Sequence, residues 1–197
     1  MIYFFKPSHE KIKKYLEENV GAYLTFADIG ITKAGGIPPH NFEKKSMRKR
    51  LGGGQSMYQK ARDAIDNMSM FDLPWVKVIK LDSKGISQGL TFAILARTFF
   101  VWTLNPVRIV YKIDETGSVD RYGFAIATLP GHEEIGEERF TVEWRHAGQS
   151  VWFEIFSFTR PRRKASRSIL KPFVEWTVQK FINSSAEAMF KAVNKKI

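Results

Sequence analysis

The sequence of 197 residues predicts an α+β protein in which a curved antiparallel sheet of about six to seven strands wraps around a long C-terminal helix. Apolar and polar residues alternate through the middle of the chain, as in the stretch 139–145, where Phe140, Val142 and Trp144 share one face. Turn sequences separate such stretches. From about residue 165 the apolar period changes to three and four residues, which is typical of an amphipathic helix.

Six strands are predicted in the central part of the chain, near residues 75–81, 88–96, 99–113, 121–129, 137–146 and 150–159. Turn sequences that contain glycine, such as Pro130-Gly131, lie between them. Pro106 falls inside the third strand. It predicts an edge or a bulge there, because proline has no N–H to donate to a sheet.

One or two short helices and a further strand are expected before these six strands. Ser8 can cap a first helix, and residues 22–31 have the apolar, β-rich composition of a first strand. Ser56 and Gln59 can form a capping box for a second helix that runs to about Met70.

The glycine-rich stretch 51–56 lies at the start of that second helix. It lacks the Gly-Lys-Ser ending of a P-loop and the Gly-x-Gly-x-x-Gly spacing of a dinucleotide site, so we interpret the glycines as a tight entry to the helix. In the C-terminal helix, Pro172 either starts the main portion or kinks it. The apolar face of that helix is formed by Leu170, Phe173, Val174, Thr177, Phe181, Ala188 and Ala192.

The totals favour one globular domain in a reducing compartment. No linker divides the chain, so we predict a single domain over 1–197, with 1–20 as a helical N-terminal extension. The absence of cysteine excludes disulfides, a thiolate nucleophile and cysteine metal sites. The chain shows neither a secretory leader nor a membrane-spanning apolar run, and we expect a soluble, cytoplasmic protein without a cofactor.

A formal charge of +11 is the strongest anomaly of the composition. The positive residues concentrate within 44–50 and 160–171, most clearly at Lys44, Lys45, Arg48, Lys49, Arg50, Arg162, Arg163 and Lys164. Such clusters attract phosphate groups on an anionic membrane or a nucleic acid, although a solvated surface that maintains solubility explains them equally well. Nucleic acid is the less favoured partner, because no reading helix or stacking platform accompanies the charge.

Several motifs of the chain occur together in one uncharacterised family. They are Leu-Gly-x-Gly at 51–54, Asn-Pro-x-Arg-x-x-Tyr at 105–111, Gly-Phe-Ala-x-x-Thr-Leu-Pro-Gly-His at 123–132, Gly-Glu-Glu at 136–138 and Arg-Pro at 160–161. With these motifs the chain resembles the domain of unknown function nineteen-ninety, from about Gly21 to the C-terminus. The first twenty residues and the basic stretch 44–50 are less typical of that family.

The resemblance implies a fold and a class of ligand. The family is similar to START-like proteins, whose helix-grip fold encloses a cavity between a bent antiparallel sheet and the C-terminal helix. That arrangement agrees with the order of elements predicted above. By analogy it implies binding of a hydrophobic or amphipathic small molecule, such as a lipid, in the cavity.

The candidates for contact with such a ligand are Arg108, Tyr111, Phe124, His132, Trp144, Glu154, Trp176 and Phe181. Most are aromatic residues at strand or helix spacing, a kind that is more often core than ligand contact. Glu154 alternates in phase with large aromatic residues of its strand. If that face is buried, the carboxylate needs a partner such as Arg97 or Arg108, or else its pKa must rise. The equal alternative is that this face is only partly buried, because Val151, Phe153 and Ile155 give the opposite face an apolar character too.

His132 precedes a run of acidic residues at positions 133, 134, 137 and 138, which raises the question of acid–base chemistry or a metal site. No second histidine follows at the spacing of a zinc protease. We therefore favour a structural turn in which the acidic residues are solvated or ion-paired.

Three functions are compatible with the sequence. The leading one is a noncatalytic module that binds a hydrophobic or amphipathic molecule between sheet and helix. The second is a peripheral protein of membranes or other anionic surfaces that uses the basic clusters within 44–50 and 160–171. The third is an enzyme that uses Glu154 or His132 on a substrate bound in the cavity.

Overall fold

The computed structural model describes residues 1–34, 40–81, 85–162 and 171–195. The elements in chain order are β1 (Ile2–Tyr3), α1 (His9–Asn19), α2 (Ile31–Ala34), β2 (Glu43–Gly53), α3 (Gln55–Asp66), the 3-10 helix η1 (Ser69–Phe71), β3 (Val76–Lys80), β4 (Thr91–Thr98), β5 (Val101–Glu115), β6 (Val119–Thr128), β7 (Glu134–Arg145), the 3-10 helix η2 (His146–Gly148), β8 (Ser150–Pro161) and α4 (Lys171–Asn194).

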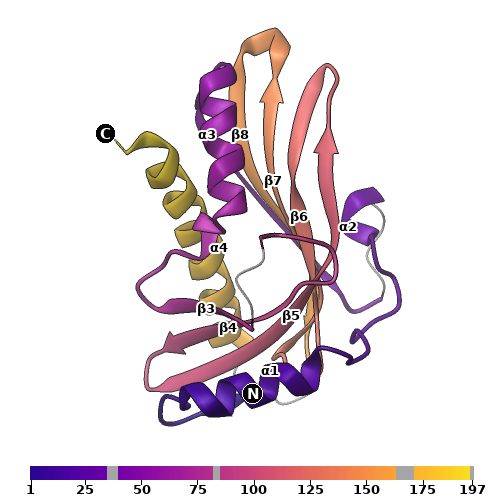
Figure 1. Cartoon of the computed structure of the whole chain (residues 1–197), viewed down its shortest axis with the longest axis vertical. Helices are drawn as coiled ribbons and strands as arrows, with labels where there is room; N and C mark the ends of the chain where they lie inside the picture. The colour runs from indigo at the N-terminus through magenta and orange to yellow at the C-terminus, as the bar shows by residue number, and fades with distance from the viewer. Residues whose placement is uncertain (35–39, 82–84, 163–170, 196–197) are drawn as a thin grey trace.

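The described residues contain one antiparallel sheet of eight strands. Seven are hydrogen-bonded in the order β2-β8-β7-β6-β5-β4-β3, and β1 pairs with the beginning of β5. Helices α3 and α4 pack on one face, called the inner face here, while α1 and α2 pack on the outer face (Figure 1). The prediction of an α+β fold with a curved antiparallel sheet around a long C-terminal helix is confirmed.

Strand alternation sorts the side chains of the sheet between these two faces. On β7, Phe140 and Val142 point to the inner face and are fully buried in the core formed with α3 and α4. Arg139, which lies between Glu138 and Phe140 in the sequence, points to the outer face and donates a hydrogen bond to a backbone carbonyl of α2. Aromatic rings fill much of the inner core, and the ring centroid of Phe71 lies 5.3 Å from that of Phe140.

Proline and glycine lie near the first described residues of the two main helices. Pro172 is the second described residue of α4, a position that is compatible with its predicted role of starting the helix. Helix α3 begins at Gln55 after Gly54, whose φ of 82° lies in the left-handed region that glycine tolerates. The predicted capping box of Ser56 and Gln59 is wrong, because no side chain caps this helix.

The prediction of a first strand over residues 22–31 is wrong. Only Ile31 belongs to a regular element, the start of α2, and Leu24 and Phe26 pack on the outer face. The first long strand is instead β2, which contains the whole basic stretch 44–50 and pairs with β8. The sequence did not reveal this strand, because its run of positive residues is typical of a solvated segment. An edge strand whose residues are nearly all exposed or part-exposed can carry such a run.

The prediction of a sheet edge or bulge at Pro106 needs correction, because β5 lies inside the sheet. On one side of β5, pairing with β6 begins at Val107, and β1 pairs only at Trp102 and Thr103. Pro106 lies between these two partners, where a missing N–H breaks no ladder. The bulge occurs further on, before Tyr111.

The inner core predicts a large effect of truncation at Phe140. We expect Phe140→Ala to lower the free energy of unfolding by about 4 kcal/mol, since the ring is fully buried and its removal leaves a cavity. The control is Tyr23→Ala, in which the lost side chain is 92% exposed, and its change should stay within about 0.5 kcal/mol. Urea denaturation followed by circular dichroism measures both; equal effects would contradict the assignment of the inner core.

Candidate ligand-binding cleft

A cleft of about 700 Å³ lies between the edge strand β2 and the first turns of α4. It is lined by Glu43, Lys44 and Lys45 from β2 and by Glu175, Trp176 and Gln179 from α4. The exposed fraction of Trp176 is 48%, so its ring offers apolar surface at the cleft. A second hollow of about 500 Å³ lies further along α4, near Trp75, and contains none of the residues predicted to contact a ligand.

A cluster of polar side chains from β2, β8 and β7 lies on the inner face beside the cleft. Strand pairing places Lys45 of β2 opposite Ser157 of β8, and Ser157 opposite Glu138 of β7. The Lys45 ammonium lies 3.8 Å from the Glu134 carboxylate, and the Thr159 hydroxyl donates to the same carboxylate at 3.3 Å. The wall formed by the sheet is therefore polar, whereas α4 presents the aromatic ring of Trp176 between the polar Glu175 and Gln179.

Glu138 is the most perturbed acid of this group. Burial, and to a lesser extent the nearby Glu134, raises the pKa of its carboxyl from the ordinary 4.5 to about 8, while Lys45 opposes the rise. Burial also raises the pKa of Glu134. At neutral pH Glu138 therefore holds its proton and can donate a hydrogen bond. The sequence predicted a solvated or ion-paired acid at this position, although Glu138 alternates in phase with Phe140 and so belongs to the inner face.

Four of the predicted contact residues lie on the inner side. Trp176 lines the cleft, and Phe181 packs next to Trp75, with ring centroids 6.3 Å apart. Phe124 is fully buried beside Phe140, and Trp144 packs against Tyr58 beneath α3. The structure thus brings one of these residues to the cleft and places Phe124 and Trp144 in the core.

Arg108 and Tyr111 lie on the outer face, away from the cleft. The Arg108 guanidinium donates to the carbonyl oxygens of Asn19 and Val20 at 3.0 and 2.7 Å, which satisfies the end of α1. The bulge in β5 turns Tyr111 outward, and its hydroxyl lies 2.6 Å from that of Thr32. These two predicted contact residues therefore do not face the side of the sheet that α4 covers.

Glu154 also points to the outer face. Its carboxylate accepts a hydrogen bond from Arg139 at 2.7 Å, and Arg48 lies 3.9 Å away. A partner was predicted for this acid, but the suggested partners Arg97 and Arg108 were wrong. The structural reason is that Phe153 and Ile155, the neighbours of Glu154, occupy the inner core.

Glu137 is the buried anchor of the outer face. It is 1% exposed, and its two carboxylate oxygens accept from the backbone N–H of Gly30 at 2.7 Å and of Thr32 at 3.0 Å. The Thr32 hydroxyl donates to it as well, and Arg139 donates to the Thr32 carbonyl at 2.7 Å. This acid therefore holds the segment before β2 against the sheet.

His132 forms part of a tight turn between β6 and β7. Its Nδ1 accepts from the backbone N–H of Glu134 at 2.9 Å, and burial lowers its pKa to about 3, so the ring is neutral. The preceding Gly131 has a φ of 93°, and a side chain there would collide with Tyr15. His132 and Glu154 both lie away from the cleft. Among the described residues no group of three acids or histidines could hold a metal ion.

The basic stretch 44–50 does not form one positive surface, because alternation divides it between the two faces of β2. Three of its residues are ion-paired: Lys45 with Glu43 and Glu134, Lys49 with Glu187, and Arg48 with Glu143 and Glu154. Lys44 and Arg50 are exposed. The residues of this stretch that were predicted to contact an anionic surface therefore do not share one face of the strand.

In the second basic cluster, Arg162 donates to the carbonyl oxygen of His132 at 2.7 Å and so supports the turn. Arg163 and Lys164 lie outside the described residues. No helix in the described part of the chain is long and apolar enough to cross a bilayer.

The model of one family, the domain of unknown function DUF1990, matches residues 25–188. The chain belongs to this family. A related protein of Dictyostelium discoideum, called a UPF0548 protein, is 30% identical over 98% of this chain and 96% of its own length. A UPF0548 protein of Arabidopsis thaliana is 31% identical over 75% of this chain and 71% of its own length.

Solved structures with little sequence similarity share the fold of this DUF1990 protein. A hypothetical protein from Helicobacter pylori has a TM-score of 0.53 at 12% identity, covering 84% of this chain and 98% of its own. Ara h 8.0201 has a TM-score of 0.50 at 12% identity, covering 77% and 97%. The predicted resemblance to this family is confirmed, and the shared fold agrees with the predicted arrangement of a bent sheet around a C-terminal helix.

The outer-face anchor gives a stability prediction. We expect Glu137→Ala to lower the free energy of unfolding by about 3 kcal/mol, because the buried N–H groups of Gly30 and Thr32 lose their acceptor. The control Glu17→Ala removes an exposed acid of α1 and should cost less than about 0.5 kcal/mol. Chemical denaturation measures the two; a neutral result for Glu137→Ala would show that the segment is held in another way.

The raised pKa of Glu138 predicts a dependence of stability on pH. Between about 4.5 and 8 the folded protein keeps a proton that the unfolded chain loses, so the free energy of unfolding falls as pH rises, by at most about 1.4 kcal/mol per unit. We expect Glu138→Gln, which cannot ionise, to reduce that slope in denaturation curves taken from pH 5 to 8. A slope identical to that of the wild type would rule out Glu138 as its source.

Proposed function

We propose that the protein binds an amphipathic small molecule, such as a lipid with a single polar end, in the cleft between β2 and α4. The observation that supports this is the contrast between the two walls. Trp176 presents apolar surface from α4, and the wall formed by the sheet carries Lys45. An apolar pocket with a few polar groups is the usual form of a small-molecule site.

The size and position of the cleft fit this proposal. Its volume of about 700 Å³ lies within the range of roughly 300 to 1,000 Å³ that is typical of such sites. It lies between the sheet and the C-terminal helix, where the START-like resemblance implies a ligand. Further along α4, the interior is occupied by Phe71, Phe92 and Phe140, so a ligand would enter from the first turns of the helix.

The polar wall favours a head group that accepts hydrogen bonds. Lys45 carries a positive charge at the cleft, and Glu138, two strands further into the sheet, keeps its proton at neutral pH. A carboxylate, phosphate or hydroxyl oxygen could accept from such donors. An apolar tail would then lie against the Trp176 ring.

The first test is mass spectrometry of protein purified without detergent. We expect the native spectrum to show a complex that loses a defined small mass on denaturation. In a titration with a dansyl-labelled fatty acid, Trp176→Ala should weaken binding about tenfold, since most of the apolar contact of one ring is lost.

Phe190→Ala is the matched control, because Phe190 is a part-exposed aromatic residue of the same helix outside the cleft. It should bind the dansyl probe as the wild type does. Equal affinity of Trp176→Ala and the wild type, or no saturable binding by either protein, would reject the cleft as the site.

A further inference from the structure

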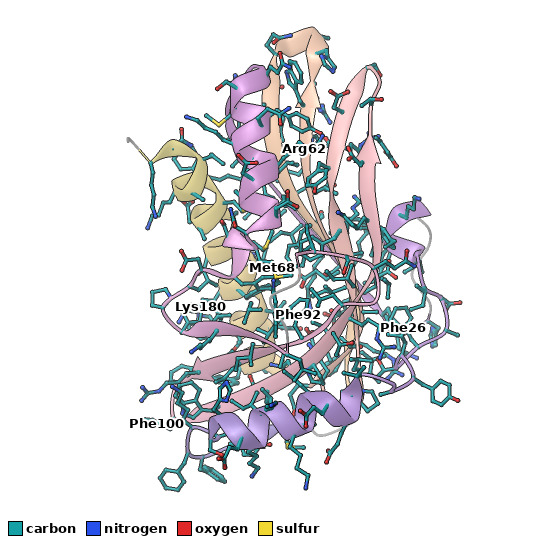
Figure 2. All side chains as sticks on the ribbon, viewed as in Figure 1. Phe26, Arg62, Met68, Phe92, Phe100 and Lys180 are labelled. Carbon is teal, nitrogen blue, oxygen red and sulfur yellow. The ribbon has the colours of Figure 1, made fainter. Side chains whose placement is uncertain are left out.

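Exposed aromatic side chains gather at the end of the molecule where β4 turns into β5. Phe99 and Phe100 form this turn and are 59% and 87% exposed. On α4, Phe173 and Trp176 lie with their ring centroids 5.1 and 5.5 Å from that of Phe99. Figure 2 shows Phe100 at the lower left extremity of the molecule, well away from Phe92 in the core.

The N-terminal residues extend this surface. Tyr3 pairs with Trp102, so Phe4 and Phe5 follow directly beside the turn, and they are 80% and 87% exposed. Lys6 makes a cation–π contact that holds the N-terminal residues beside the turn, with its ammonium 5.6 Å from the centre of the Trp102 ring. The aromatic tip therefore consists of Phe4, Phe5, Phe99, Phe100, Phe173 and Trp176.

Folding does not explain this composition of the turn. The β4–β5 connection has two residues, and Phe99 occupies its first position with a φ of 53°. Glycine, asparagine or aspartate is the usual residue at a positive φ in such a hairpin, and a bulky side chain there is strained. Because Phe99 and Phe100 remain largely exposed, they recover little of that cost by burial. Residues that conflict with local structure in this way commonly serve binding.

Cations surround the aromatic tip. Lys6 and Arg97 both lie 5.6 Å from the centre of the Trp102 ring, and Lys180 lies 4.9 Å from that of Trp176. Aromatic rings between cations match the interface of an anionic bilayer, where rings enter the headgroup region and cations meet phosphate. The net charge of +11 favours such a surface, whereas two copies that met through their tips would bring like charges together.

We propose that the aromatic tip is a docking surface for anionic lipid bilayers. Phe100 and its neighbours insert between the headgroups, and Lys6, Arg97 and Lys180 contact the phosphates. This surface is distinct from the split basic stretch of β2. It adjoins the cleft through Trp176, which belongs to both, but docking does not depend on what the cleft binds.

The test is co-sedimentation of the full chain with vesicles of phosphatidylcholine that contain about 30% phosphatidylserine. We expect wild-type protein to bind, and to bind at least about tenfold more weakly when the salt concentration rises from about 0.05 to 0.5 M. Phe99→Ser with Phe100→Ser should lose about tenfold or more of the affinity, since two inserting rings are gone.

Two controls separate docking from other effects. Tyr23→Ser removes an aromatic residue that is 92% exposed outside the tip and should bind vesicles as the wild type does. The double variant should keep the wild-type denaturation midpoint or exceed it, and should bind the dansyl probe normally. The proposal is overturned if wild-type protein ignores anionic vesicles or if the double variant binds them equally well. Dimerisation that the double variant abolishes, without vesicle binding, would assign the tip to self-association instead.

Discussion

Burial of both faces of one sheet is the constraint on which this structure depends. Alternation on β7 sends Phe140 to the inner face and Arg139 to the outer face, so each face needs its own cover. Helices α3 and α4 cover the apolar inner face. The chain before β2 covers the more polar outer face, where a charged side chain can be buried only if ion pairs or hydrogen bonds satisfy it. Glu137 accepts from Gly30 and Thr32 for this reason.

This division explains why the family motifs do not mark the cleft. Arg108 and Tyr111 of the Asn-Pro motif, and Glu137 of the Gly-Glu-Glu motif, bind the N-terminal segment to the outer face. Glu138, the next residue of the same motif, points the other way, towards the side of α4. One motif therefore contributes both to the scaffold and to the polar wall near the proposed ligand site, because successive residues of a strand face opposite directions.

The cleft and the aromatic tip meet at Trp176, on an early turn of α4. One part of this residue borders the cleft, and its ring lies 5.5 Å from Phe99 of the tip. Docking at the tip would bring the entrance of the cleft close to a bilayer, and an amphipathic ligand could then pass between lipid and protein without crossing much water. The same exposed aromatic surface is unfavourable in water, which is why a partner surface accounts for it better than folding does.

The sequence by itself determined the fold class, the six strands between residues 75 and 159 and the amphipathic C-terminal helix, because period-two and period-3.6 patterns are local properties of the chain. It did not reveal β2, whose charges read as a solvated cluster, or the outward position of Tyr111, which a single bulge in β5 reverses. Alternation shows that Glu138 and Phe140 share a face, but only the tertiary structure decides what covers that face. The cleft, the anchoring of Glu137 and the aromatic tip each join segments far apart in sequence, and such contacts arise only once the sheet and α4 have packed.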